Sequence, residues 1–405
     1  MNQKIKLLFV IESLTLAGSE KSLIALLSKL DYSKYDVDLQ LFSYGDPLQE
    51  FLLQNVNLLP PLSFTEFTNL SWFQSLLKCN VRFLFARMKY SVKIRKGIYT
   101  NSQKAQFFWE SSRNAFQQTD IVYDIAIAYA QSIPTYYVAD KINASKKIAW
   151  VNVTVPYEGN NKSFQSRYYE GYDQIVPVSK DTEKHLSAEF PFLKIKLYTI
   201  EDVIDYKSIV RLSNLVTPEF DKNKFNILTV ARLTKSQKGY DITLETCRIL
   251  KEKNINFHWY VVGEGPYKNE MITFINENNL NDYFTFLGTT KNPYPYFRTA
   301  DLYVQTSRHE GYGLSIAEAR LLNTPVVTTR FDTVFMQMVH EKNGLVTDLN
   351  AEAVAEAIVR LMTDKNLYDS IVRNLKQEMK ENVESIKLFN AMIEKLLLEK
   401  ADGKL

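Results

Sequence analysis

The segment "SRHEGYGLSIAEA", residues 307 to 319, combines two carboxylates and two glycines at a spacing that suits ligand binding. Glu310 and Glu318 have seven residues between them. Gly311 and Gly313 would let backbone amides approach a ligand closely, and the helix expected to start just after them points its positive N-terminal end at the same place. Such a pocket favours an anionic or hydroxyl-rich ligand.

Two other interpretations of this segment stay open when it is taken alone. The glycines could simply form a turn, with Glu318 favouring the helix dipole. The two carboxylates could also catalyse glycoside hydrolysis. That reaction needs them roughly 5 Å apart to retain the anomeric configuration, or about 6.5 to 9.5 Å apart to invert it. Hydrolysis would explain neither the glycines nor a pair of cations found earlier in the chain.

These cations lie in "ARLTKSQKGYD", residues 231 to 241, which follows an apolar run that predicts a strand. Arg232 and Lys238 stand on either side of a short polar turn. Arginine offers a planar fork for phosphate oxygens and lysine a point charge. By itself the loop could be a solvated turn, but together with "EGYGLSIAE" it predicts an anion site.

Other turns carry weaker signals. "VVGEGP", residues 261 to 266, ends a strand but completes no dinucleotide fingerprint. "LAGSEKSL" places Gly18 and Ser19 between the first strand and the first helix, where Ser19 could cap the helix and Gly18 would face the carboxyl ends of the strands. No histidine or cysteine spacing suits a metal, and "DVD", residues 36 to 38, is unconvincing as a metal site, so we expect neither metal nor cofactor.

The elements that must position these residues form two series of short β-like runs with helical or loop segments between them. This pattern predicts an α/β fold with two parallel sheets. The first series is "KLLFVI", "VDLQLFS", "YDIAIAYA", "KIAWVNV", "QIVPVS" and "KLYTI"; the second is "FNILTVARL", "FHWYVVGEG", "YFTFLG", "DLYVQTS", "PVVTTR" and "GLVTD".

The polar stretch 202 to 224 separates the two series and predicts the domain boundary. We expect domains at 1–205 and 206–380, with a C-terminal helix at 381–405. Asn350 can cap one helix of the second domain. In the C-terminal helix Phe389, Met392, Ile393, Leu396 and Leu397 mark one apolar face that must pack on another part of the protein.

Composition limits the class of protein. The chain has 405 residues, is 45% apolar and 23% charged, and carries a net charge of +3 from 49 basic and 46 acidic residues. These values predict a globular protein and give no argument for nucleic acid. Two distant cysteines, Cys79 and Cys247, suggest neither disulfides nor zinc, and they predict the reducing cytosol. We expect no signal peptide and no spanning helix.

Residues 67 to 109 differ from this balance, because they contain eight cations and no acidic residue. Aromatic and apolar residues are interleaved with the cations. Such a segment suits an anionic membrane surface, although a solvated helix face with a core-facing stripe is the alternative. The cations are Lys78, Arg82, Arg87, Lys89, Lys93, Arg95, Lys96 and Lys104.

Taken together, "AGSE", "ARLTKSQKGYD", "VVGEGP" and above all "EGYGLSIAE" resemble the retaining glycosyltransferases of family 4, whose E-x7-E motif the last segment matches. The resemblance covers residues 225 to 350 in motif order and spacing. It implies the GT-B fold, in which two Rossmann-like domains face each other across a cleft and the C-terminal helix packs on the N-terminal domain.

The resemblance also implies a role for each site residue. Arg232, Lys238 and Gly18 would bind the donor diphosphate, and Glu318 the ribose. The candidate catalytic residue is Glu310, which would position the donor sugar. The remaining donor-sugar residues would be Gly311, Tyr312, Gly313, Leu314 and Asn152.

Two positions depart from the family pattern. Such enzymes often carry a histidine where "WVNVT" has Asn152, and an asparagine where "IEDVID" has Asp202. Asn152 can hydrogen-bond a sugar hydroxyl but cannot be a charged partner at neutral pH.

The function implied is metal-independent, retaining transfer of a hexose from a nucleotide sugar, a UDP-sugar above all, to a glycan acceptor. The acceptor would be lipid-linked, and the product a cell-surface polysaccharide made in the cytoplasm at the inner face of the plasma membrane. Two alternatives remain open: a nucleotide-sugar epimerase of the same fold, and a non-catalytic glycan-binding or protein-binding partner of a transferase.

Overall fold

A computed structural model of the chain describes residues 4–78, 80–153, 157, 159–378, 380 and 383–402. It divides into two compact units. Unit 1 is Met1–Ile204 with Asn382–Leu405, and unit 2 is Asp205–Glu381. Cys79 lies outside the described residues, whereas Cys247 is a buried free thiol.

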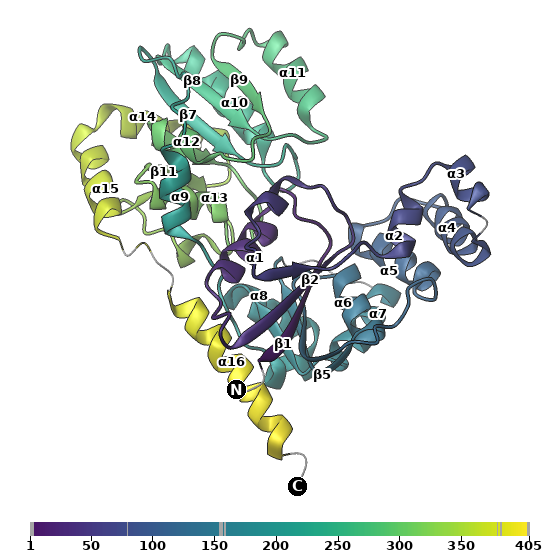
Figure 1. Ribbon diagram of the computed structural model, residues 1–405. Helices are drawn as coiled ribbons and strands as arrows, with labels where there is room; N and C mark the ends of the chain where they lie inside the picture. Colours follow the sequence, from purple (N-terminus) through teal and green to yellow (C-terminus); the bar gives the residue numbers. More distant parts are fainter. Residues whose placement is uncertain are drawn as a thin grey trace. The chain divides into compact units, whose positions relative to one another are not determined.

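Unit 1 is built on a six-stranded parallel sheet with the strand order β3-β2-β1-β4-β5-β6 (Figure 1). In the central strand, Leu7 is in register with Val37 of β2 and with Ile125 of β4. The strands are β1 (Ile5–Ile11), β2 (Tyr35–Leu41), β3 (Val56–Leu58), β4 (Val122–Ala128), β5 (Asn143–Val151) and β6 (Gln174–Pro177).

Helices cover both faces of this sheet. Their bounds are α1 (Gly18–Ser28), η1 (Pro47–Phe51), α2 (Ser63–Thr68), α3 (Trp72–Leu77), α4 (Val81–Ile94), α5 (Asn101–Ser112), α6 (Ile133–Lys141), α7 (Gly159–Glu170), α8 (Lys180–Glu189), η2 (Pro191–Lys196) and α16 (Val383–Asp402). Because side chains alternate along a strand, Phe9 belongs to one apolar core and its neighbour Leu8 to the other.

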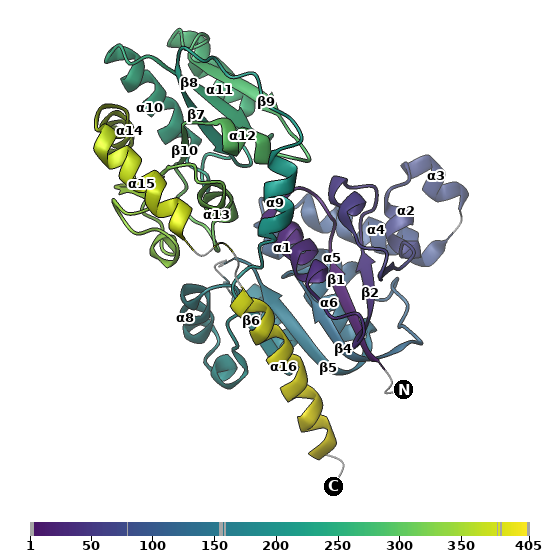
Figure 2. The ribbon, with the colours of Figure 1, turned by 60° about the vertical axis from the view of Figure 1, so that its left-hand side comes forward.

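The C-terminal helix α16 completes one of these cores (Figure 2). Phe389, Met392 and Ile393 are buried, and the Phe389 ring stacks on Phe9 with centroids 6.3 Å apart. Tyr35 donates a hydrogen bond of 3.0 Å to the Asn390 side chain. The predicted packing of this helix on the N-terminal domain is confirmed.

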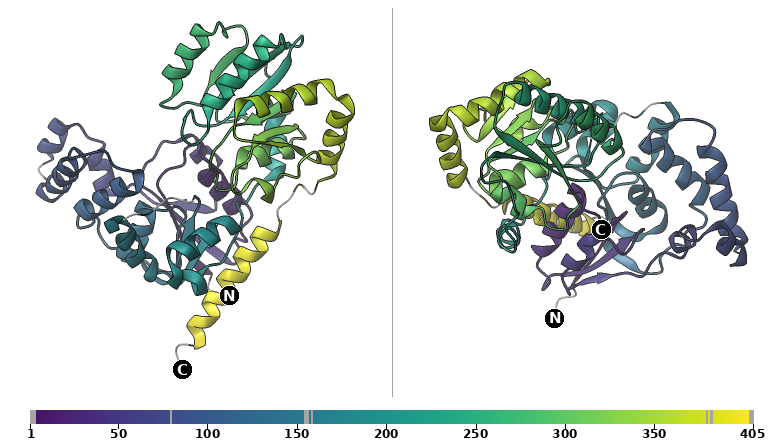
Figure 3. Two further views of the ribbon diagram at one scale, coloured as in Figure 1. Left: turned by 180° about the vertical axis from the view of Figure 1, so that it is seen from behind. Right: turned by 90° about the horizontal axis from the view of Figure 1, so that it is seen from above.

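Unit 2 repeats the topology with the order β12-β11-β10-β7-β8-β9. Two further views of the ribbon show this second sheet with its helices (Figure 3). Its strands are β7 (Phe225–Val230), β8 (Phe257–Val262), β9 (Phe284–Gly288), β10 (Leu302–Gln305), β11 (Val326–Thr329) and β12 (Gly344–Thr347). Its helices are α9 (Tyr206–Ser213), α10 (Tyr240–Glu252), α11 (Lys268–Glu277), α12 (Tyr294–Thr299), α13 (Leu314–Leu321), η3 (Val334–Met336), α14 (Ala351–Thr363) and α15 (Lys365–Gln377).

The predicted α/β class with two parallel sheets is confirmed, and two local predictions, the strand at "KLYTI" and the cap at Ser19, are wrong. "KLYTI" is not a strand, because it contributes only a single bridge from Leu197 to Ile175. Ser19 does not cap α1: the helix already begins at Gly18 with Ala17 as its N-cap. The stretch 202 to 224 contains a helix, α9. The predicted cap at Asn350 is correct, since its side chain accepts from the Ala353 amide at 2.8 Å.

Each sheet reverses its strand order next to its first strand, between β1 and β4 in unit 1 and between β7 and β10 in unit 2. In open α/β sheets, ligands bind outside the carboxyl ends of the strands at such a switch point. In unit 2 the loops that follow β7 and β10 carry the segments 231–241 and 307–313. The fold therefore places the two sequence motifs of unit 2 at one edge.

Candidate functional site

The loop after β7 is fastened to the end of β10 by backbone contacts. Thr306 donates through Oγ1 to the carbonyls of Lys238 at 3.1 Å and Gly239 at 2.9 Å. Gly239 has φ 63°, and a Cβ on it would lie 2.0 Å from the Thr306 carbonyl oxygen. Only glycine fits this left-handed position against the neighbouring strand. The close approach brings Lys238 beside the segment that follows β10.

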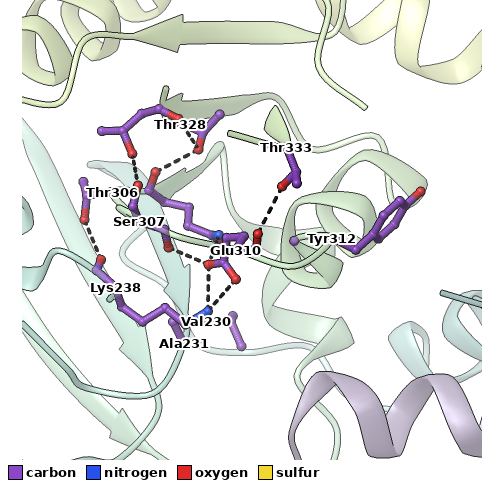
Figure 4. A network of polar contacts seen from close by, with 12 residues as sticks. Val230, Ala231, Lys238, Thr306, Ser307, Glu310, Tyr312, Thr328 and Thr333 are labelled. Carbon is purple, nitrogen blue, oxygen red and sulfur yellow. Dashed lines mark hydrogen bonds and ion pairs between the residues drawn. The ribbon is translucent and has the colours of Figure 1, made fainter. Parts of the chain in front are cut away.

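Lys238 and Glu310 form an ion pair at this place (Figure 4). The Lys238 Nζ donates to Glu310 Oε1 at 2.7 Å and to Oε2 at 2.8 Å. The lysine side chain is 19% exposed and the glutamate side chain 8%, so water screens the pair poorly. Lys238, predicted to bind the diphosphate, and Glu310, predicted to position the sugar, are therefore in direct contact although they are distant in sequence.

Further donors fix the orientation of the Glu310 carboxylate. Its Oε1 also accepts from Gln305 Nε2 at 2.7 Å and from Ser307 Oγ at 2.6 Å. Gln305 in turn accepts from the Tyr303 hydroxyl at 2.6 Å, and Gln305, Ser307 and Tyr303 are all buried. Oε1 thus has three donors, whereas among the described residues Oε2 accepts from Lys238 alone. Oε2 therefore keeps more hydrogen-bonding capacity for a ligand hydroxyl than Oε1.

The Gly-Tyr-Gly turn leads from Glu310 into α13. Gly313 is the N-cap of this helix with φ 85°, a left-handed conformation that glycine adopts without strain. The Gln337 side-chain amide donates to the carbonyls of Tyr312 and Gly313. In Figure 4 the Tyr312 ring points away from Glu310. The amides of Ile316 and Ala317 bond to the Gly313 carbonyl, so those of Leu314 and Ser315 are the first amides of α13 that can bind an acceptor atom.

The other predicted residues of unit 2 lie nearby but in different surroundings. Arg232 is exposed, and its side chain has no ion pair with any described residue. Glu318 is buried in α13, where its Oε1 accepts from the Tyr294 hydroxyl at 3.2 Å. Burial, and next the Glu318 carboxylate, raise the pKa of Tyr294 well above its usual value. The hydroxyl therefore stays protonated as a donor to Glu318.

Gly18 and Asn152 belong to unit 1, at the carboxyl edge of its sheet. Gly18 is the first residue of α1. Asn152 follows β5, and its side-chain amide donates to the Tyr129 carbonyl at 2.9 Å, which ties it to the end of β4. Their roles towards a nucleotide sugar stay predictions, as do those of the unit 2 residues.

A pocket of about 500 Å³ is lined in part by residues of the 231–241 loop. Its lining includes Lys235, Tyr267, and an ion pair between Arg308 and Asp241 at 2.8 Å. Burial acts to raise the pKa of Asp241, but the Arg308 guanidinium outweighs it and lowers that pKa. Neither Lys238 nor Glu310 lines this pocket. The ion pair between Arg308 and Asp241 therefore stabilises the loop without being part of the candidate site.

No group of three or more histidine, cysteine, aspartate or glutamate side chains within the described ranges is placed to bind a metal. No helix in the same ranges has the length and apolar character needed to cross a bilayer.

The sequence analysis missed Gln305, Ser307 and Gln337. Gln305 and Ser307 had a visible signal, because "QTS" is a polar run at the carboxyl end of a buried strand, where ligands gather in such sheets. Gln337 had none, since it reaches the glycine turn from a loop that follows a different strand.

Comparison with known proteins identifies similar glycosyl transferases. Residues 214–378 match the family "Glycosyl transferases group 1". The alpha-monoglucosyldiacylglycerol synthase of Acholeplasma laidlawii is 27% identical over 55% of this chain and 56% of its own length. A putative colanic acid biosynthesis glycosyltransferase of Escherichia coli is 30% identical over 34% of this chain and 37% of its own. The alignments thus span about half, or less, of these curated relatives.

A crystal structure of Anabaena Alr3699/HepE, in complex with UDP and glucose, has the same fold. The two chains superpose with a TM-score of 0.66 at 16% identity, over 98% of this chain and 99% of the other. The fold of the chain is therefore GT-B, two Rossmann-like α/β units. The match to the group 1 glycosyl transferases covers residues 214–378, and the chain is related to glycosyltransferases of bacterial polysaccharide biosynthesis.

Proposed function

We propose that the protein is a retaining glycosyltransferase that moves a hexose from a UDP-sugar to a glycan acceptor, lipid-linked, in the synthesis of a cell-surface polysaccharide. The observation that carries the proposal is the Lys238–Glu310 pair at the switch point of unit 2, beside the N-terminus of α13. The names of the relatives support the donor and the acceptor: one is a glycolipid synthase, and one was solved with UDP and glucose.

Lys238 can serve the diphosphate without leaving Glu310. A lysine ammonium has three N–H donors, and two are directed at the Glu310 oxygens, so one remains for a phosphate oxygen. Negative charge develops on the diphosphate as its bond to the anomeric carbon breaks. Lys238, the exposed Arg232 and the first amides of α13 would stabilise that charge.

Glu310 has the complementary role towards the sugar. Positive charge grows on the sugar ring as the bond stretches, and a carboxylate with one oxygen turned to the ligand can stabilise it or fix a sugar hydroxyl. The leaving phosphate can take the proton of the acceptor hydroxyl on the same face of the ring. The configuration at the anomeric carbon is then retained without a protein base.

The decisive experiment compares donor binding and slow donor hydrolysis in three variants. Lys238→Met is expected to weaken UDP-sugar binding by roughly 10- to 100-fold, since a hydrogen bond to a charged group contributes about 1.5 to 3 kcal/mol. Glu310→Gln is expected to lower turnover with little change in binding. Lys268→Met is the matched control, because Lys268 pairs with Glu264 at 2.6 Å on the surface of the same unit.

Normal binding and turnover in both site variants would rule the proposal out. Conversion of the donor to an epimer without acceptor would favour the epimerase, and binding without any turnover the non-catalytic partner. With an acceptor, NMR of the product should show the anomeric configuration of the donor, and added EDTA should leave the rate unchanged.

A further inference from the structure

Helix α4 presents an apolar face to solvent. Val81, Phe85, Met88 and Val92 recur at helical spacing along one side, and each is more than half exposed. Soluble proteins rarely expose contiguous apolar surface of this kind without an interaction partner. This row of four residues is named the α4 row below.

The α4 row is not a core face that happens to be loosely packed. The inward side of the same helix already supplies the core contacts. The Phe83 ring meets Phe64 edge-on at 5.3 Å, the Tyr90 ring meets Phe108 at 5.4 Å, and Ala86 is buried. The helix therefore has two apolar sides, and only one of them is used within unit 1.

The short helix α3 is fastened to α4 and adds to the exposed apolar surface. The Arg87 guanidinium lies over the Trp72 ring at 4.5 Å and donates to Leu70 O at 2.8 Å and Ser75 Oγ at 2.6 Å. Figure 1 shows α3 and α4 at the outer edge of unit 1, beyond α2 and α5. The exposed apolar residues of α3 are Trp72, Phe73, Leu76 and Leu77.

Cations flank this surface, and carboxylates are missing from it. No aspartate or glutamate occurs between residues 67 and 109. Glu66 and Glu110 border this stretch, and Glu110 pairs with Lys93 at 2.5 Å. The cations exposed around the two helices are Lys78, Arg82, Lys89, Arg95 and Lys96.

We propose that α3 and α4 dock unit 1 on an anionic lipid bilayer, with α4 in the plane of the interface. The α4 row would enter the boundary of headgroups and acyl chains, and the flanking cations would contact lipid phosphates. A second copy of the chain fits this surface poorly, since a two-fold contact would place cations opposite cations. The proposal concerns attachment and stands independently of the sugar-transfer chemistry.

The test is flotation of the full chain with vesicles of phosphatidylglycerol and phosphatidylcholine in equal parts. The chain should float with these vesicles and not with phosphatidylcholine alone. Replacing Arg82, Lys89, Arg95 and Lys96 by glutamine should lower the partition coefficient by roughly 10²- to 10³-fold, at about 1 kcal/mol for each cation. Raised salt should weaken binding of the unchanged chain.

A second variant tests the apolar contribution. Phe85→Ser with Met88→Ser should reduce vesicle binding by at least about tenfold, because each side chain would lose its burial in the lipid. The matched control is Ile195→Ser with Lys180→Gln, which alters an exposed apolar residue and an exposed cation elsewhere in unit 1. All altered side chains are exposed, so thermal unfolding should be unchanged.

Equal flotation of the chain and both variants would overturn the proposal, and so would equal binding to phosphatidylcholine alone. Self-association that the Phe85 and Met88 changes abolish, without vesicle binding, would assign the face to a second copy instead. Donor hydrolysis, measured without vesicles, should be the same in all these variants. Loss of flotation is thereby distinguished from loss of the transferase site.

Discussion

Replacing Asp202 by asparagine should remove a pH-dependent loss of stability in unit 1. Asp202 is 6% exposed and lies in the core region near Ser22 and Tyr129. Burial raises its pKa from 3.8 to about 7; a hydrogen bond from Ser22 opposes this shift, and Glu201 adds to it. Asparagine has nearly the same shape as the protonated acid and no charge to bury.

The direction and size of this change in stability follow from the pKa of Asp202 in the unfolded chain and in the folded state. The folded state binds the proton more tightly than the unfolded chain, so stability is greatest below pH 3.8 and falls until the pH passes about 7. The shift of about 3 units corresponds to roughly 4 kcal/mol in total. The interval from pH 5 to the folded-state pKa of about 7 covers about two of these units. Between pH 5 and pH 8 the free energy of unfolding of the wild type should therefore fall by about 3 kcal/mol relative to that of Asp202→Asn.

The assay is urea unfolding of both proteins at pH 5 and pH 8. Other titrating groups are common to the two proteins and cancel in the difference. Asp120→Asn, a change at an exposed carboxyl of unit 1, is the control and should show no such difference. Parallel profiles of the wild type and Asp202→Asn would refute the reasoning, because they would mean that burial does not disfavour the charged form of Asp202.

Two further predictions concern the candidate site. Gln305→Met should lower kcat of donor hydrolysis by about 10- to 100-fold with little change in KM, because Glu310 loses an orienting donor; an unchanged kcat would show that Gln305 does not position it. Gly239→Ala should destabilise unit 2 and weaken donor binding, as measured by thermal unfolding and titration. Gly288→Ala is its control, since φ is 71° there but no atom lies within 4 Å of the added Cβ; equal effects would exclude the clash with Thr306.

The strands of unit 2 could be predicted from the sequence, because each is an apolar run bounded by polar or glycine turns. It failed where burial depends on distant partners. β3 spans only Val56–Leu58, too short to show a period. "KLYTI" has a strand composition, but it follows η2 and pairs at one position. The helix α9 lies in a polar stretch whose packing surface is supplied by α12.

Site prediction had a similar limit. The E-x7-E spacing and the cation loop are local patterns, so the sequence could single out Glu310 and Lys238. Their direct contact depends on Gly239 lying against Thr306, which is a property of neighbouring strands. The donors from Gln305 and Gln337 reach the site through side-chain orientation and packing, and neither leaves a spacing in the sequence.

Because α16 packs in unit 1 although it is the last helix of the chain, it affects the order in which the two units can fold during synthesis. Unit 2 is continuous in sequence and complete once residue 381 has been made, whereas the core around Phe9 also needs Phe389 and Met392. On the ribosome, the first unit to be translated is therefore the last to obtain its full core. Until α16 emerges, the sheet of unit 1 carries an uncovered apolar strip, a state in which chaperone binding and aggregation compete with folding.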